Sequence, residues 1–532
     1  MRIKFLIFFL LSGYFVTGQT VYEPTYRSVY QYLSRLAQRG VIDVHDVIQP
    51  ISRKNIAIYL HELEKNPEAL TGLEKKELEY YAKEYSYETL LLYSDSLLKQ
   101  EAGLTLFKIP KGDRPRFVAT QSRKFTANAQ PIFGYDYFGN SEGQSYGVMR
   151  AGFWASGYIG KQVGFSLDYR SNIAKGDGID FDRSFTPEPG VIGERKKNGD
   201  FVYTDVKASV SYDWDWGTLT LAKDKMPVGY GYSGKIILSD KAPTFPLIRL
   251  DVQPLRWLAF NYAHLWLNSD VVDSTRIRYS GYGNRYQVNH VPKKMAIHSF
   301  ILTPFKGLNV LIGESIIYND ELKLSYLIPV NFFRSAALFE GEASRGTTFS
   351  NTQVFFQISS RNHIPKTHLF TSWYIDDVYH KKGVKRRQYA FNTGISVTDV
   401  LLPNLTLSAD YAKIYPYAYM HHMNTLTYQH AGYTLGHWLG TNADIVNVDL
   451  RYRVLRGLEL MAGFQKIRKG SEGKQGEQLS AVNIPFLWGD LRKISQTSFA
   501  ARYEFTADLF LRVAYQADQE NKRYSMGLTY GF

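Results

Sequence analysis

The sequence predicts a mainly β fold: a transmembrane antiparallel β-barrel of about 18 strands, in a range of 16 to 20, preceded by a small α-helical bundle. Three observations support this prediction. After about residue 115, apolar and polar residues alternate in segments of roughly 8 to 10 residues, which is the period of a membrane-spanning strand. The polar positions carry many charges, as a water-filled lumen requires. Aromatic residues make up 15% of the chain and gather at segment ends, where interfacial girdles form.

The first 18 residues have the order of a secretory signal peptide. Arg2 and Lys4 precede an apolar run from Phe5 to Val16, and small residues follow, so cleavage after Gly18 is expected. A membrane anchor is the alternative, but it needs about 20 apolar residues and this run is shorter.

Residues 19–105 are predicted to form a helical bundle in the periplasm. The stretch from Tyr26 to Ile42 has apolar residues at helical spacing and ends near Gly40, a typical C-cap glycine. Ser52 is a natural N-cap for the next helix, which Pro67 ends, and Thr71 begins a third. The charged faces of these helices are expected to be solvated surface.

Residues 106–532 are predicted to form the barrel. In the segment 163–170, apolar side chains on one face oppose Gly, Ser, Asp and Arg on the other, and the segments 149–156, 206–213, 446–454 and 499–505 repeat this pattern. A soluble sheet with one wet face would also alternate. The barrel is favoured because the alternation continues for some 400 residues without a helical segment, a linker or a repeat.

The last ten residues, RYSMGLTYGF, predict the closing strand of the barrel. Its bulky face should meet lipid, and its small polar face of Ser, Gly and Thr should meet the lumen. A closed barrel has no free edge, so this strand must pair with the first one. A terminal aromatic residue resembles the signal that the barrel-insertion machinery reads, and it is carried here by Tyr524, Met526, Leu528, Tyr530 and Phe532.

Bulk composition limits the chemistry. The 532 residues carry a net charge of +13, which suits nucleic acid, an anionic membrane or an acidic polysaccharide. The predicted outer-membrane location argues against nucleic acid. The chain has no cysteine, which excludes disulfides, thiolate chemistry and cysteine-ligated metals.

Four blocks of the predicted barrel are distinctive: Leu221–Leu250, His298–Phe333, the SWYIDDV stretch and Tyr428–Asp444. In this order they resemble the capsule assembly Wzi family, in a form found in Bacteroidota. The resemblance implies an outer-membrane barrel with a periplasmic helical bundle. It also implies a surface lectin that helps to attach capsular polysaccharide and is not an enzyme. Some relatives are associated with gliding motility or other surface machinery.

Candidate site residues fall into four groups. Two carboxylates for glycoside cleavage could come from Glu314, Asp320 and Glu321 with Asp376 and Asp377, but lumenal ion pairs are the simpler interpretation. His421, His422, His430 and His437 follow no metal-ligand spacing, so neither a metal nor another cofactor is expected. The glycine-rich GYGYSG stretch precedes no helix, and it favours a tight bend over a phosphate loop.

The basic residues form the fourth and most informative group. Guanidinium groups and aromatic rings together suit an anionic sugar. The ligand-binding residues predicted on this ground, with those of the other groups, are Lys381, Lys382, Lys385, Arg386, Arg387, Tyr389, Glu314, Asp376, Asp377, His437 and Trp438.

Three hypotheses follow for the function. The first is a non-enzymatic outer-membrane barrel that binds or helps to assemble surface polysaccharide. The second is an accessory subunit of a larger outer-membrane complex, such as a secretion or motility apparatus. The third is a diffusion channel for oligosaccharides, which requires an open lumen. Expected partners are therefore outer-membrane lipid, surface polysaccharide, the insertion machinery and, for the second hypothesis, other subunits.

Overall fold

A computed structural model describes residues 20–93, 102–106, 114, 116–122, 124–183, 185–280, 285–319, 321–339, 350–381, 384–472 and 484–531. The expected signal peptide, Lys382 and Phe532 lie outside the described residues.

The N-terminal part of the chain contains four described helices. They are α2 (Val29–Gln38), α3 (Arg53–Lys65), α4 (Gly72–Glu84) and α5 (Ser86–Tyr93), with a short 3-10 turn at Pro67–Ala69. The predicted caps are present: the Ser52 side chain accepts a hydrogen bond from the Asn55 amide, and Thr71 forms a capping box with Glu74. Gly40 has φ +73°, the left-handed conformation that ends α2. A shared apolar core holds these helices together.

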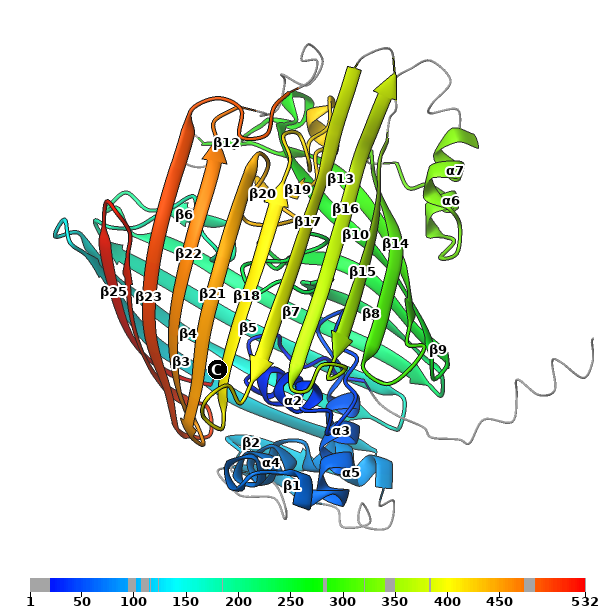
Figure 1. Ribbon diagram of the computed structural model, residues 1–532, viewed down its shortest axis with the longest axis vertical. Helices are drawn as coiled ribbons and strands as arrows, with labels where there is room; N and C mark the ends of the chain where they lie inside the picture. Colours follow the sequence, from blue (N-terminus) through cyan, green and yellow to red (C-terminus); the bar gives the residue numbers. More distant parts are fainter. Residues whose placement is uncertain are drawn as a thin grey trace, which may run out of the picture.

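Eighteen antiparallel strands form a closed barrel, which confirms the predicted fold class (Figure 1). The last strand pairs with the first along its length, from Arg523 opposite Asn140 to Tyr530 opposite Phe133. The strands are β3 (Phe125–Asn140), β4 (Ser145–Ile159), β5 (Val163–Gly176), β7 (Phe201–Trp214), β8 (Gly217–Asp224), β9 (Phe245–Leu255), β10 (Leu258–Val272), β13 (His290–Leu302), β14 (Leu308–Tyr318), β15 (Ser350–Arg361), β16 (Thr367–Lys381), β17 (Val384–Thr398), β18 (Leu405–Ile414), β21 (Ala443–Leu455), β22 (Leu458–Gly470), β23 (Leu491–Thr506), β24 (Leu509–Ala517) and β25 (Lys522–Tyr530).

Several shorter elements are not part of this ring of strands. β2 (Val118–Gln121) pairs with the first residues of β3, and β1 (Ala102–Leu106) pairs with β2. The connections contain β6 (Gly193–Arg195), the pair β11 (Arg278–Ser280) and β12 (Arg285–Gln287), the pair β19 (Gln429–His430) and β20 (Tyr433–Thr434), the helices α6 (Leu324–Leu327) and α7 (Phe333–Phe339), and 3-10 turns at Ser274–Arg276 and Asn424–Leu426.

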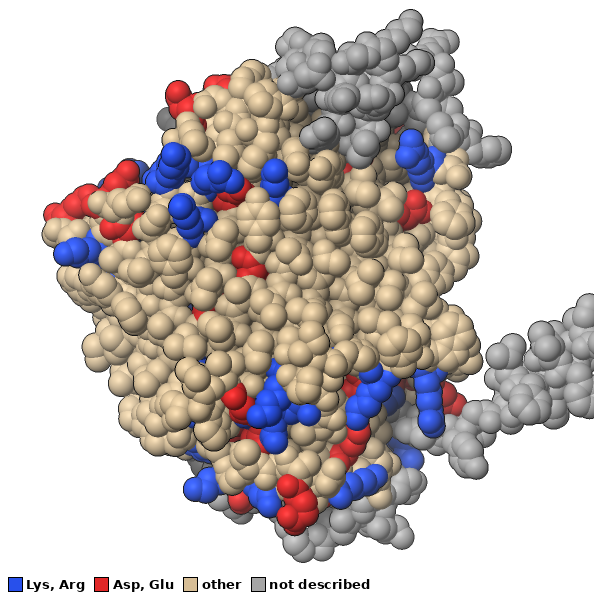
Figure 2. Space-filling model, viewed as in Figure 1, with Lys and Arg blue, Asp and Glu red and all other residues tan. Residues whose placement is uncertain are grey.

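The two faces of the wall follow the alternation in the sequence. On β25, Tyr524, Met526 and Leu528 are exposed on the outside, whereas Gly527 and Thr529 are buried on the lumenal side. The outer surface has a broad band almost free of charge between two zones that carry Lys, Arg, Asp and Glu (Figure 2). This is the surface that a lipid-facing barrel needs. Among the described residues, no helix has the length and apolar character needed to cross a bilayer.

The helical bundle covers one mouth of the barrel, at the same end as the C-terminus (Figure 1). We call this the helix end and the opposite mouth the loop end. Ion pairs attach the bundle to several parts of the barrel. They join Arg27 to Asp508 (2.5 Å), Arg35 to Asp399 (2.5 Å), Lys54 to Asp213 (2.8 Å) and Arg453 to Glu77 (2.7 Å).

Candidate functional site

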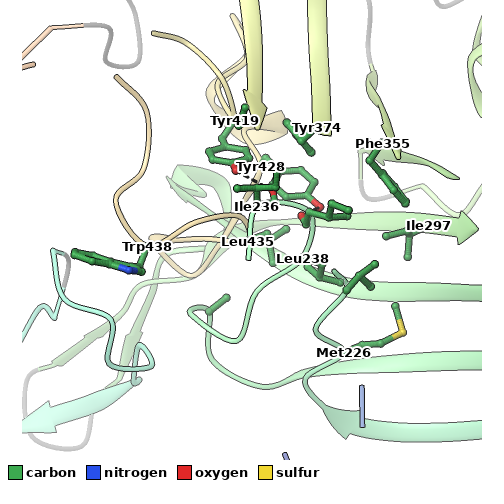
Figure 3. Close-up of a cluster of buried hydrophobic side chains, with 14 of the residues drawn as sticks. Met226, Ile236, Leu238, Ile297, Phe355, Tyr374, Tyr419, Tyr428, Leu435 and Trp438 are labelled. Atoms are coloured by element: carbon green, nitrogen blue, oxygen red, sulfur yellow. Dashed lines mark hydrogen bonds between the residues drawn. The ribbon is translucent and has the colours of Figure 1, made fainter. Parts of the chain in front are cut away.

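Three segments fold into the lumen and fill it. They are residues 41–51, which follow α2, residues 225–244 between β8 and β9, and residues 415–442 between β18 and β21. Their apolar side chains join inward-facing residues of the wall in one buried cluster (Figure 3). We call these three segments the plug. The cluster follows the wall from β9 to β22, so the plug fills the part of the lumen that these strands enclose.

The glycine-rich stretch forms the bend at the centre of the plug. Gly229 has φ +98°, and Val228 pairs with both Leu238 and Ile48 as isolated β-bridges. The Gly229 amide also donates to the Val47 carbonyl (2.8 Å). These bonds join two segments of the plug to each other, which agrees with the structural interpretation of GYGYSG.

Asp376 supports the third segment of the plug. Its Oδ2 accepts a hydrogen bond from the Tyr419 amide (3.1 Å). The hydroxyls of Tyr419 and Tyr428 then donate to the carbonyls of Ile236 and Ile237, both at 2.8 Å, and Figure 3 shows these rings side by side. Asp376 is therefore a structural residue that fixes the backbone of a folded-in loop.

His437 and Trp438 also belong to the plug. The Trp438 indole donates to the Ser233 carbonyl (2.7 Å), and the His437 Nδ1 accepts from the Leu439 amide (3.3 Å). His437 is fully buried, and burial lowers its pKa to about 3, so the ring stays neutral. Both side chains hold the inner ends of two loops together.

Ser233, His437 and Asp410 lie close together, but they do not have the geometry of a catalytic triad. In a triad the carboxylate orients the imidazole. Here the Asp410 Oδ2 accepts from the Ser233 hydroxyl itself (2.6 Å), and the His437 Nε2 lies 3.4 Å from that hydroxyl. All three residues are buried; Ser233 and His437 belong to the plug, and Asp410 belongs to β18 of the wall. The group joins the bend at Ser233 to the wall of the barrel.

The predicted basic residues lie on the hairpin of β16 and β17 at the loop end (Figure 1). The backbone register pairs Lys381 with Val384, His380 with Lys385, Tyr379 with Arg386, Val378 with Arg387, and Asp377 with Gln388. The structure therefore places Lys381, Lys385, Arg386 and Arg387 on one extended hairpin, away from the plug.

Tyr389 lies in an aromatic girdle on this part of the wall. Its ring packs against Tyr415, with centroids 4.3 Å apart, and against Trp373, with centroids 6.0 Å apart. The ring of Trp373 in turn stacks on that of Phe391 at 5.0 Å. Ala390, the next residue of β17, is buried in the lumenal cluster, so Tyr389 faces outward from the wall.

Glu314 is not part of a lumenal ion-pair network, which corrects the structural interpretation from the sequence. It shares the outward face of β14 with the exposed Ile312, and a connecting segment covers it from outside. Its Oε1 accepts from the Phe333 amide (2.6 Å) and lies 3.4 Å from the His298 Nε2. The predicted residues thus fall into three places: the plug, the hairpin with its girdle, and the outer wall.

A polar cavity of about 290 Å³ remains in the lumen between α2, residues 230–235 and the wall from β15 to β21. Its lining includes the rings of Tyr230 and Tyr232. Within the described part of the chain, two of its charged residues, Lys235 and Asp449, have no opposite charge within 4 Å; the Lys235 ammonium donates to the Gln49 side chain (3.3 Å). Burial lowers the pKa of Lys235 to about 8. Such a cavity can hydrogen-bond a small hydroxylated ligand.

The loop end carries a second feature that the sequence did not single out. Three guanidinium groups lie over aromatic rings: Arg183 over Tyr203 (5.0 Å to the centroid), Arg195 over Phe181 (4.6 Å) and Arg492 over Phe185 (5.8 Å). Arg195 and Arg492 are exposed. We call these six residues the cationic rim. In the sequence, Arg195 lies in the basic stretch GERKKNGD.

Across the described residues, no group of three His, Asp or Glu side chains is arranged to hold a metal ion. His430 shows why the histidines do not converge: its Nδ1 accepts from the Asn268 amide (3.0 Å), which joins the plug to β10.

No protein-family model matches the chain, and no curated protein matches it either. Among solved structures, the chain resembles Wzi of Escherichia coli, described as a carbohydrate-binding β-barrel of the outer membrane involved in group 1 capsule assembly. The match covers 97% of this chain and 100% of Wzi, with 13% identity and a TM-score of 0.55. The outer membrane protein OpdK of Pseudomonas aeruginosa matches 76% of this chain and 98% of its own, with 11% identity and a TM-score of 0.44. The first likeness shows that the chain has a Wzi-like fold.

Proposed function

We propose that this protein is a non-enzymatic outer-membrane barrel that binds surface polysaccharide at its loop end, with its helical bundle in the periplasm. The observation that carries the proposal is the plug in the lumen of a barrel whose fold resembles that of Wzi over nearly the whole chain. A closed barrel of this kind holds a ligand rather than conducting it.

The loop end offers the chemistry that an anionic polysaccharide requires. The basic hairpin supplies Lys381, Lys385, Arg386 and Arg387, and the cationic rim supplies three guanidinium groups next to aromatic rings. Guanidinium forks bind carboxylates in a bidentate manner, and ring faces pack against sugar rings. The carbohydrate binding described for Wzi supports the same type of ligand.

Glu314 and Asp376 are not placed as a glycosidase pair would be. Glycoside cleavage needs two carboxyl groups about 5 to 9.5 Å apart, both next to the scissile bond. Glu314 lies beneath a segment on the outer wall, and Asp376 is bound to the backbone of the plug. Neither one faces a shared cleft.

The channel hypothesis requires an open lumen. A diffusion channel needs a continuous aqueous path. The plug, which fills the lumen beside the wall from β9 to β22, argues against such a path. The accessory-subunit hypothesis is compatible with a closed barrel, and a gentle detergent pull-down that recovers stoichiometric partners would favour it.

The test is retention of polysaccharide on cells that lack the protein. Re-expressed wild type should restore retention. A hairpin variant with Lys381, Lys385, Arg386 and Arg387 changed to Gln should not. A matched cavity variant, Lys235→Gln with Asp449→Asn, should restore it as wild type does.

Each other outcome has a distinct meaning. If the hairpin variant restored polysaccharide retention and the cavity variant did not, the binding site would be the cavity in the lumen and not the hairpin. Normal retention in cells without the protein, together with no binding of the purified protein to those glycans on an array, would end the proposal. Membrane levels of both variants must equal the wild-type level.

A further inference from the structure

The connection from β14 to β15 folds back over the outside of the barrel. Its described part, residues 321–339, contains α6 and α7, which lie beside the outer wall in Figure 1. We call residues 321–339 the outer strap. Like the plug segments that follow β8 and β18, it leaves the sheet at the loop end, but it turns outward and not into the lumen.

The inner face of the outer strap packs on the wall formed by β10, β13 and β14. The Tyr326 carbonyl accepts a hydrogen bond from the Tyr262 hydroxyl (2.8 Å). The ring centroids of Tyr326 and Tyr318 are 4.8 Å apart, and those of Phe333 and His298 are 4.6 Å apart. The buried apolar residues of this contact are Phe260, Tyr262, Ala296, Ile316, Tyr318, Tyr326, Phe333, Ala336 and Ala337.

Polar side chains lie beneath the outer strap, on the face of the wall that elsewhere meets lipid. His298 pairs with Glu314 (3.4 Å), and the His264 Nε2 lies 2.7 Å from the Tyr318 hydroxyl. Ionisable groups in direct contact with a bilayer core are costly. The strap covers these groups and supplies Glu314 with an amide donor from Phe333. It therefore has to stay attached for this part of the wall to face a membrane.

The outer face of the outer strap is apolar. Leu324 is 75% exposed and Phe332 is 70% exposed, and Leu322, Ile328 and Val330 are exposed as well. The exposed charges Glu321 and Arg334 lie to either side of this run. Apolar residues flanked by charges are typical of a segment that lies along a membrane interface.

The depth of the outer strap agrees with such a position. β14 ends at Tyr318, and the strap reaches back to Glu314, four residues down, which is about 13 Å along a strand. The next outward residues on the same strands, Ile312 and Phe300, are exposed and apolar. The surface of the strap is thus continuous with the lipid-facing band of the barrel.

We propose that the outer strap is a membrane-embedded segment that contacts the acyl chains of the leaflet at the loop end through Leu324, Val330 and Phe332. The occupant of this apolar face is lipid. The strap adds an interfacial anchor to one side of the barrel and keeps the polar pairs of the wall away from the bilayer.

The test uses the natural absence of cysteine, which makes every introduced thiol unique. Single variants Leu324→Cys and Phe332→Cys carry a nitroxide spin label in native outer membranes. Ile312→Cys serves as the lipid-facing control. Leu401→Cys, at a turn where the side chain is 94% exposed, serves as the water-facing control.

Oxygen and a water-soluble nickel complex then report on the surroundings of each label. The strap labels should behave as the Ile312 label does, with high accessibility to oxygen and low accessibility to nickel. Nickel accessibility close to that of the Leu401 label would place the strap in water and overturn the inference. Low accessibility to both reagents would show a protein partner over the strap and overturn it as well.

Discussion

Removing the carboxylate of Asp46 should loosen the plug. The Asp46 Oδ2 accepts from the Arg361 guanidinium (2.9 Å), and its Oδ1 accepts from the Tyr230 hydroxyl. Both Asp46 and Arg361 are buried. This contact joins the first segment of the plug, through Asp46, to the second segment and to the end of β15.

The magnitude follows from the charge left behind. Asp46→Ala leaves the Arg361 guanidinium buried without its counter-charge, and breaking a buried ion pair in this way costs about 3–5 kcal/mol. At about 1.4 kcal/mol per tenfold, local opening of the plug should become roughly 150 to 4,000 times more frequent.

The assay is native-state hydrogen exchange at two amides that hold the plug together. Gln49 donates to the Pro227 carbonyl (2.9 Å), and Gly229 donates to the Val47 carbonyl (2.8 Å). Both should exchange faster in Asp46→Ala by the factor given above, whereas amides in the middle of the β10–β13 ladder should not change. Glu79→Ala, at an exposed helical position, is the control variant and should leave all these rates at their wild-type values.

A double variant separates the lost ion pair from a general loss of packing. Asp46→Ala with Arg361→Met removes both charges, so much of the lost protection should return. Unchanged exchange at Gln49 and Gly229 in the single variant would refute the reasoning. So would a double variant that is as unprotected as the single one.

Four further outcomes are expected. In planar bilayers the wild type should pass little current, and a steady open-channel conductance would contradict the closed lumen. Burial raises the pKa of Asp46, but Arg361 and the Tyr230 hydroxyl together lower it below its usual value. Burial likewise raises the pKa of Glu74, but Arg35, the Thr71 amide and Arg39 together lower it. This stabilisation is complete above about pH 4–4.5 and is lost as the pH falls through the lowered values, so the protease resistance of the plug and the bundle should be constant near neutrality and fall only in acid. Met526→Arg on the lipid face should lower the free energy of unfolding in liposomes by about 2–4 kcal/mol, and Ser525→Arg on the lumenal face by less. Deleting Phe532 should impair insertion while the bundle still folds, and normal membrane levels of the truncated chain would oppose this.

The alternation of the sequence was sufficient to predict the wall of the barrel. It separates Met526 and Leu528 from Ser525 and Thr529, and the structure places these pairs on opposite faces as predicted. The helix caps at Ser52 and Thr71 are local interactions, so the sequence indicated them correctly. Closure of β25 on β3 followed from the requirement that a membrane barrel has no free edge.

The contents of the lumen could not be predicted in this way. His437 and Trp438 are in a loop, where no period indicates which side of the wall the chain enters. Glu314 was the one error that the sequence could have revealed, because it alternates in phase with Ile312 and Ile316 on the apolar face of its strand. An acidic residue in that phase requires a cover, and the outer strap provides it.

Equilibrium binding tests the central claim most directly. The purified protein in nanodiscs is titrated with the polysaccharide released from the surface of the same cells. Binding should be saturable, weakened by salt because the hairpin contacts are ionic, and lost when Lys385, Arg386 and Arg387 are changed to Gln. A folded, closed barrel that binds none of this polysaccharide at any concentration would contradict the account.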